Sequence, residues 1–222
     1  MYSSFTPVGY QSSTSLSVIK CTGLFDYYML GSLGSSSSVQ KTFTGLGVNH
    51  YQVKVYYGYA LMAASWTYPL LLQLIDGSGT VTNDTKTPTC VADGLSGCLW
   101  SLGCYSNYIK TVAYSSNALT LNFVLASTLA AGQAWGIRDI VIVLTTCHAS
   151  CATCTAAAST NCITCAAGLY FSGTICISQC AYYTMIDSKQ CVISCPSYYY
   201  LNTINSFCEA CPTGCPTCTS YN

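Results

Sequence analysis

Apolar and polar residues alternate along several stretches of the first two thirds of the chain. The alternation is clearest over residues 50–57, where Tyr51 and Val53 are separated by Gln52. A period of two is typical of a strand with one face buried and the other in water. The pattern therefore predicts a β-strand over residues 50–57.

The same alternation predicts further strands, with turns rich in Gly, Ser, Asp and Asn between them. In chain order they cover residues 16–18, 70–75, 80–82, 108–114, 118–126 and 135–144. Residues 108–114 and 118–126 are expected to pair as a hairpin across residues 115–117. The Gly/Ser-rich residues 31–47 and the cysteine-containing residues 88–104 predict loops.

No stretch has the periodicity of an amphipathic helix. A run of short strands joined by polar turns is typical of β-sandwiches and barrels. We therefore expect an all-β chain, whose first part is a jelly-roll-like β-sandwich followed by a disulfide-stapled cysteine-rich repeat rod.

The cysteines divide the chain unevenly, because 13 of the 17 follow residue 146. Residues 147–222 are poor in Leu, Val and Phe, so they cannot bury a large core and need covalent links or metal. We expect three segments: a flexible arm or first strand over residues 1–20, the β-sandwich over residues 21–146, and the cysteine-rich repeats over residues 147–222.

Two chemistries compete for the cysteine-rich segment. Pairs such as Cys151–Cys154 and Cys162–Cys165 have the spacing of zinc ligands. The cysteines continue beyond any four-ligand site, however, and almost no Lys or Arg lies nearby to stabilise thiolates. We favour disulfides, each contributing about 3 kcal/mol by restricting the unfolded chain, and hence an extracellular or cell-surface protein.

The cysteine spacing repeats within the segment. The triplet Cys147-x3-Cys151-x2-Cys154 recurs at Cys211, Cys215 and Cys218, and this register resembles furin-like, growth-factor-receptor-type cysteine-rich repeats. The resemblance implies the pairs Cys147–Cys154, Cys151–Cys162, Cys165–Cys176, Cys180–Cys191, Cys195–Cys208 and Cys211–Cys218.

Two questions about the cysteines stay open. Cys215 has no partner within residues 1–222 under this pairing, so we expect the natural chain to continue with further repeats. The remaining four are expected to pair among themselves in one of three connectivities. They are Cys21, Cys90, Cys98 and Cys104.

A second resemblance extends upstream. The motifs Ala64-Ser65-Trp66, Ile75-Asp76-Gly77 and AWGIRDI at residues 134–140 are similar to those of large surface proteins of ciliates and related protists. In those proteins a β-sandwich precedes furin-like repeats. The resemblance implies the same architecture and a location at the cell surface.

Charge excludes several classes of partner. Only 6% of residues are charged, with seven Lys and Arg against seven Asp and Glu. A nucleic-acid-binding protein needs a basic face, and this chain has none.

No apolar run reaches the ~18 residues of a membrane span. The few acids show no paired carboxylates, so we expect no enzyme activity.

A few polar residues are candidates for specific roles. Asn83-Asp84-Thr85 is the only N-glycosylation sequon in the chain. Arg138 is expected to form a structural ion pair with Asp139 or Asp76, or otherwise to pair with a ligand. Asp76, Asp84 and Asp93 are weak candidates for calcium and are otherwise turn formers. No other cofactor is expected.

These observations predict a structural protein of a cell-surface coat or extracellular filament. It would associate with itself or with other surface proteins through the sandwich and the N-terminal arm, and would carry attached glycans. The alternative is a carbohydrate- or ligand-binding ectodomain of a cell-surface receptor, in which the abundant tyrosines contact sugars or proteins.

Overall fold

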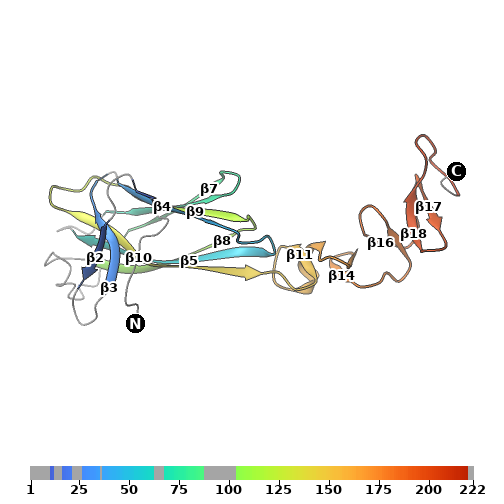
Figure 1. Ribbon diagram of the computed structural model, residues 1–222, viewed down its shortest axis with the longest axis horizontal. Coiled ribbons are helices and arrows are strands. Elements are labelled where there is room, and N and C mark those ends of the chain that lie inside the picture. Colours follow the sequence, from blue (N-terminus) through green and yellow to red (C-terminus); the bar gives the residue numbers. More distant parts are fainter. Residues whose placement is uncertain are drawn as a thin grey trace. The chain divides into compact units, whose positions relative to one another are not determined.

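The structure is a computed structural model that describes residues 11–12, 17–21, 27–35, 37–62, 68–87 and 104–219 (Figure 1). Cys90, Cys98 and Asp93 lie outside the described residues, as do the side chains of Cys21 and Cys104. The chain divides into two compact units. The first comprises residues 1–47, 53–112 and 116–143, and the second comprises residues 48–52, 113–115 and 144–222.

The first sheet of the sandwich has five strands in the order β1-β4-β9-β6-β7. All of its pairs are antiparallel. Its strands are β1 (Gln11–Ser12), β4 (Ser38–Thr44), β6 (Leu70–Asp76), β7 (Val81–Lys86) and β9 (Ala118–Leu125). On β9, buried and half-buried positions alternate, so Leu119, Leu121 and Phe123 point into the core.

The second sheet also has five strands, in the order β2-β3-β10-β5-β8. Its strands are β2 (Ser17–Cys21), β3 (Tyr27–Leu33), β5 (His50–Met62), β8 (Cys104–Ala113) and β10 (Ala134–Thr146). The buried residues Val53, Val55 and Tyr57 of β5 face the first sheet, where Tyr57 meets the ring of Phe123 edge-on with 5.2 Å between centroids. The two sheets therefore enclose one core, and the expected all-β sandwich is confirmed.

The loop expected over residues 31–47 is wrong, because β3 and β4 occupy most of it. Gly31 lies opposite Gly136 of β10 in the sheet register. A Cβ on Gly136 would stand 2.6 Å from the Leu30 carbonyl oxygen and 3.0 Å from the Gly31 Cα. Glycine is present here because two strands approach closely, and not because the chain turns.

The hairpin expected from residues 108–114 and 118–126 is also wrong. The strands exist, but β8 pairs in the second sheet and β9 in the first. Backbone hydrogen bonds hold both ends of the segment that links the two strands. The Tyr114 N–H donates to the Tyr51 carbonyl oxygen, whereas the Asn117 carbonyl oxygen accepts from the Leu46 N–H. The chain therefore crosses from one sheet to the other at the point where the sequence predicts a tight turn.

The cysteine-rich region consists of short strands and one 3₁₀ turn, η1 (Ser159–Asn161). β11 pairs with β12, β13 pairs with β14, and a four-stranded sheet has the order β16-β15-β18-β17. The strands are β11 (Cys151–Cys154), β12 (Cys162–Cys165), β13 (Tyr170–Ser172), β14 (Ile175–Ile177), β15 (Tyr183–Met185), β16 (Cys191–Val192), β17 (Tyr199–Asn202) and β18 (Phe207–Ala210).

Six disulfides link these strands and their loops. They join Cys147–Cys154, Cys151–Cys162, Cys165–Cys176, Cys180–Cys191, Cys195–Cys208 and Cys211–Cys218. These are the six pairs that the resemblance to furin-like repeats implies. Cys215 is exposed and has no disulfide partner among the described residues.

Candidate binding groove

A groove lies across three neighbouring strands of the second sheet, β10, β5 and β8. Its volume is about 500 Å³, within the range of small-ligand sites. Its wall includes three exposed aliphatic side chains, because Ile109, Val141 and Val143 have exposed fractions of 58%, 51% and 42%. The full lining is Tyr56, Tyr57, Asn107, Tyr108, Ile109, Asp139, Val141 and Val143.

The valines of β10 point outward in the second half of the strand. Residues 134–137 are all buried, and from Arg138 to Leu144 half-buried even-numbered residues alternate with exposed odd-numbered ones. Val141 and Val143 are therefore exposed, whereas Ile140 and Ile142 are the more buried residues. Asp139, at the start of this alternation, has φ 52°, in the left-handed region.

Two residues of the lining, Tyr57 and Tyr108, pack their rings against each other behind the exposed surface of the groove. Tyr108 packs against Tyr57, with 5.5 Å between ring centroids. Its hydroxyl donates to the Thr87 carbonyl oxygen at 3.2 Å, so the ring is fixed at the open edge of the sandwich. Burial raises the pKa of Tyr57 far above its usual range, with the Asp84 charge as a smaller cause. Tyr57 is therefore a neutral, structural residue of the core behind the groove.

The rim carries the polar groups of the groove. The Arg138 Nε donates to the Asp139 Oδ2, so the structure forms the ion pair considered from the sequence. The Asp139 side chain is 54% exposed, so solvent screens the pair and leaves it little weight in stability. Asn107 is exposed at the β8 side of the groove.

Two of the three candidate calcium ligands, Asp76 and Asp84, are held by separate partners. The Asp76 Oδ1 accepts from the Ser78 hydroxyl at 2.6 Å, and the Ser78 and Thr80 N–H groups add further bonds. These bonds, the hydroxyl first, lower the pKa of Asp76. The Asp84 Oδ1 contacts the Lys110 Nζ at 3.2 Å and the Lys86 Nζ at 3.5 Å. Within the described ranges, no group of three His, Cys, Asp or Glu side chains could hold a metal.

Asn83, the residue of the predicted sequon, lies on β7 in the first sheet. It is exposed and accepts a hydrogen bond from the Gln73 Nε2 at 3.3 Å. Since the groove belongs to the second sheet, Asn83 and the groove are on different sheets of the sandwich.

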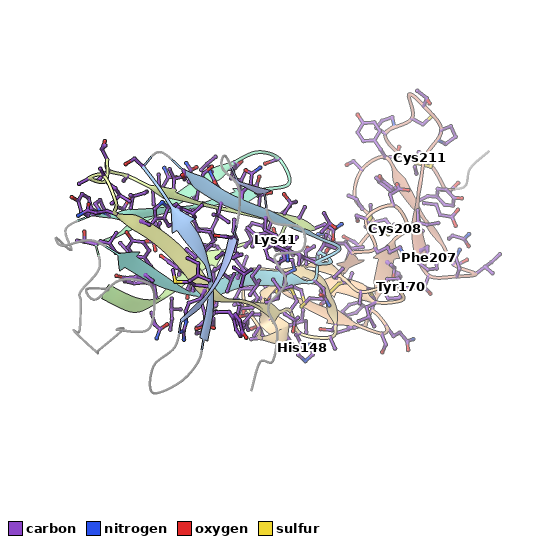
Figure 2. All side chains as sticks on the ribbon, turned by 60° about the vertical axis from the view of Figure 1, so that its left-hand side comes forward. Lys41, His148, Tyr170, Phe207, Cys208 and Cys211 are labelled. Atoms are coloured by element: carbon purple, nitrogen blue, oxygen red, sulfur yellow. A yellow bond between two sulfur atoms is a disulfide. The ribbon has the colours of Figure 1, made fainter. Side chains whose placement is uncertain are left out.

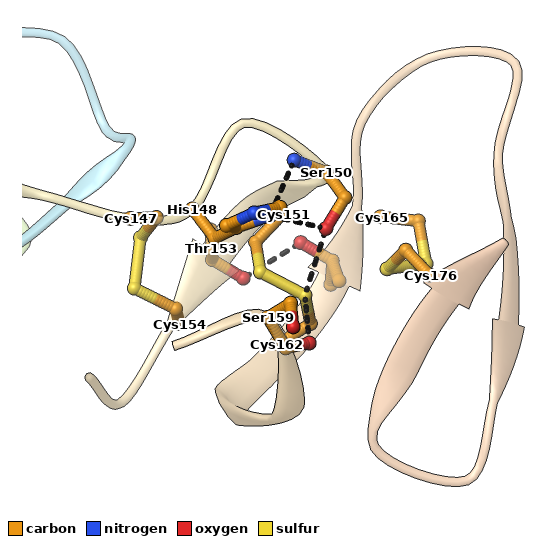
Figure 3. Close-up of a disulfide and its surroundings, with 11 residues drawn as sticks. Cys147, His148, Ser150, Cys151, Thr153, Cys154, Ser159, Cys162, Cys165 and Cys176 are labelled. Carbon is orange, nitrogen blue, oxygen red and sulfur yellow. Dashed lines mark hydrogen bonds between the residues drawn. A yellow bond between two sulfur atoms is a disulfide. The ribbon is translucent and has the colours of Figure 1, made fainter. Parts of the chain in front are cut away.

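The first disulfides form a small core of their own (Figure 3). Cys147, Cys151, Cys154 and Cys162 are buried together, and Tyr51 and Phe171 pack against them. Further along, Tyr170 and Phe207 bring strands of two different sheets together, with 6.5 Å between ring centroids (Figure 2). Aromatic rings thus supplement the disulfides where no larger core exists.

The two histidines have different surroundings. His148 is exposed, and its Nδ1 lies 2.8 Å from the Ser150 hydroxyl and accepts from the Ser150 N–H at 3.2 Å (Figure 3). His50 is buried and stacks on Tyr114 with 5.9 Å between centroids. Among the described residues, neither ring nitrogen of His50 has a hydrogen-bond partner. Burial lowers the pKa of His50.

The sequence contains one indication of the groove, in the part of β10 where apolar residues do not alternate with polar ones. Residues 140–144 read Ile-Val-Ile-Val-Leu, with no polar residue at any position. A strand that is apolar on both faces either lies between two layers or presents an apolar surface. β10 presents an apolar surface. Ile109, which lies between Tyr108 and Lys110, gave no such signal.

Across the part of the chain that the structure describes, no helix is long and apolar enough to cross a membrane.

Comparison with known proteins gives one match by sequence. The chain is 35% identical over 74 residues to furin-like protease 2 of Drosophila melanogaster. The match covers 33% of this chain and 4% of that relative, so the chain spans only a small part of its length. No family model matches. Together with the six disulfides, the match agrees with furin-like repeats in the cysteine-rich region.

Comparison with solved structures gives carbohydrate-binding modules. The CBM22-1 xylan-binding domain of Xyn10C from Paenibacillus barcinonensis is 15% identical, and the match covers 63% of this chain and 88% of the domain with a TM-score of 0.41. TmCBM61, solved with β-1,4-galactotriose, is 10% identical, with coverage of 62% and 89% and a TM-score of 0.41. The C-terminal CBM6 of LamC from Zobellia galactanivorans is 14% identical, with coverage of 60% and 90% and a TM-score of 0.39.

Proposed function

We propose that the sandwich is a carbohydrate-binding module of an extracellular protein and that its ligand is a neutral oligosaccharide bound in the groove. The observation that carries this proposal is an exposed apolar groove with amide and carboxylate groups at its rim. Sugar rings present apolar C–H faces as well as hydroxyl groups. They therefore suit a site that combines aromatic and aliphatic walls with a few polar groups.

Each part of the groove has a role in this proposal. The ring of Tyr56, which lines the groove from β5, packs on a sugar face. Val141 and Val143 provide the apolar floor beside it. Asn107 both donates and accepts hydrogen bonds to hydroxyls, and Asp139 accepts them. The chain has seven positive and seven negative side chains in all, which favours an uncharged ligand over an acidic one.

The cysteine-rich region supports an extracellular location. Six disulfides form and persist in oxidising compartments, such as the cell exterior. In this proposal the cysteine-rich repeats act as the spacer that carries the binding module. The resemblance to surface proteins of ciliates and related protists fits the same arrangement.

The test begins with a glycan array on the full chain secreted from eukaryotic cells. Xylan and β-1,4-linked galactose oligomers are the first probes, because proteins with these ligands are among the structural neighbours. Binding is then measured by calorimetry for two matched variants. Val141 and Val81 have exposed fractions of 51% and 46%, but only Val141 lines the groove.

We expect Val141→Asp to lose at least about tenfold in affinity, equivalent to about 1.4 kcal/mol, because a carboxylate in the groove must be desolvated by the ligand. Val81→Asp is expected to bind as the unaltered chain does. If no glycan binds, or if both variants lose affinity equally, the groove is not a carbohydrate site.

Assembly into a coat or filament through residues 1–20 has less support. The described parts of this arm already pair within the chain, because β1 pairs with β4 and β2 pairs with β3. Strand donation to another molecule would have to break these pairs. Sedimentation of the full chain discriminates the two functions, since a coat subunit forms large assemblies that deletion of residues 1–20 abolishes.

A further inference from the structure

We propose that Asn83 carries an N-linked glycan and that this glycan lies on the outer face of the first sheet, leaving the groove free. The sequon alone indicates only that the modification is possible. The three sequon residues lie on β7, and the alternation of this strand determines where each of them points.

A row of amide side chains crosses four strands of the first sheet. In the sheet register, Gln40 of β4 lies opposite Asn122 of β9, Asn122 opposite Gln73 of β6, and Gln73 opposite Asn83 of β7. The Asn122 Nδ2 donates to the Gln73 Oε1 at 2.9 Å. The Gln73 Nε2 donates in turn to the Asn83 Oδ1 at 3.3 Å. These two bonds run in one direction and end at the sheet margin.

This direction leaves the reactive atom of Asn83 available. Asn83 uses its oxygen in the row, and among the described residues its Nδ2 has no hydrogen-bond partner. Glycosylation takes place on the amide nitrogen, so the modification preserves the bond from Gln73. The folded sheet therefore accommodates a glycan at the end of the row.

The other two sequon residues are placed favourably by strand alternation. Thr85 is exposed, as Asn83 is, and the period of two puts it on the same outer face. Asp84 faces the opposite way, where Lys86 and Lys110 hold its carboxylate. The negative charge in the middle of the sequon is therefore paired with lysines on the face of the strand turned away from the glycan.

The modification is a group transfer from a lipid-linked oligosaccharide pyrophosphate of the secretory pathway. The Asn83 Nδ2 forms a bond to the anomeric carbon, and the bond from that carbon to the pyrophosphate oxygen breaks. The lipid pyrophosphate leaves with the electron pair, and a base of the transferase takes the proton from Nδ2. The disulfides of the chain require the same oxidising pathway.

The glycan would cover a vulnerable part of the sandwich. β7 is the last strand of its sheet, and edge strands present unpaired backbone groups that can pair with another molecule. A bulky polar group beside this edge blocks such pairing. The groove lies on the outer face of the other sheet, so the same group does not obstruct a ligand there.

The experiment uses the full chain secreted from eukaryotic cells. Intact mass is measured before and after treatment with a peptide N-glycosidase, and peptide mapping then locates the Asp that the enzyme leaves in place of the glycosylated Asn. We expect a mass loss for the unaltered chain and Asp at position 83. Thr85→Ser keeps a sequon and retains the mass loss, whereas Thr85→Ala abolishes it.

Two results would overturn the proposal: an unaltered chain whose mass does not change on treatment, or a mass loss that Thr85→Ala retains. Peptide mapping needs no variant, so the answer does not depend on whether Thr85→Ala folds. Glycan binding by the treated and untreated chains is compared separately. Equal affinities are expected, and a gain in affinity on treatment would show that the attached glycan reaches the groove.

Discussion

The close approach of β3 and β10 leads to a prediction about three glycines. Gly136→Ala adds a methyl group that would overlap the Met29 Cε and would lie 2.6 Å from the Leu30 carbonyl oxygen and 3.0 Å from the Gly31 Cα. The methionine can move aside, but the backbone atoms cannot move without separating the two strands. Overpacking of this kind costs about 3 kcal/mol.

The other two glycines provide a graded control. At Gly31 the added carbon would lie 3.0 Å from the flexible Met29 Cε and 3.3 Å from the Trp135 carbonyl oxygen, so a smaller loss is expected. At Gly34 nothing lies within 4 Å, and alanine is expected to be neutral or to stabilise by up to about 1 kcal/mol. The expected order of stability is Gly34→Ala, then Gly31→Ala, then Gly136→Ala.

Urea denaturation followed by tryptophan fluorescence measures this order. Trp135 is fully buried beside Gly136 and reports on the same part of the core. A loss of about 3 kcal/mol lowers the denaturation midpoint by about 1–2 M for a domain of this size. A midpoint for Gly136→Ala equal to that of Gly34→Ala would refute the reasoning, because the strands would then have room for a side chain.

Three further predictions follow from other parts of the chain. Acidification is expected to lower the free energy of unfolding. The cause is His50, which in the unfolded chain has a pKa of about 6.5 and takes up a proton, whereas burial in the folded protein opposes protonation of the ring. His50→Leu is expected to flatten this pH dependence between about pH 7.5 and 5.5. Equal pH dependence of the denaturation midpoint in both proteins would contradict it. Replacing both Cys195 and Cys208 by alanine removes their disulfide and is expected to destabilise the four-stranded sheet by about 3 kcal/mol. Hydrogen exchange is expected to show lost amide protection in this sheet and unchanged protection in the sandwich. Asp139 has φ 52°, so Asp139→Gly is expected to be more stable than Asp139→Val by about 1–2 kcal/mol in thermal denaturation. Equal stabilities of the two variants would contradict a left-handed residue at this position.

The strands with a clean alternation could be predicted from the sequence. β6 and β9 follow the expected pattern, because each has one face in the core and one in water. β5 follows it from Val53 to Tyr57, but residues 57–61 are buried at every position. Alternation says nothing about a strand's partner, and for this reason the hairpin of β8 and β9 was wrong. β3 and β4 were missed because glycine and serine were interpreted as turn residues, whereas Gly31 is required by its neighbour across the sheet.

The candidate sites depend on features that no local pattern contains. The groove is lined by residues of three strands that become neighbours only in the folded sheet. The amide row requires the register of four strands from distant parts of the chain. The disulfide pairs, in contrast, came from the resemblance to furin-like repeats, since spacing alone left the pairing of the cysteines open.

The continuity of β10 has a mechanical consequence. This strand lies between β3 and β5, lines the groove through Val141 and Val143, and runs directly to Cys147, the first cysteine of the disulfide series. Because the chain is continuous, tension on the cysteine-rich region enters the sandwich through β10. This strand is paired on both sides, so two ladders of hydrogen bonds hold it in the sheet. Beyond Cys147, disulfides between cysteines 7 to 13 residues apart limit how far the chain can extend under tension. β10 is thus the strand through which the cysteine-rich region is anchored to the sandwich.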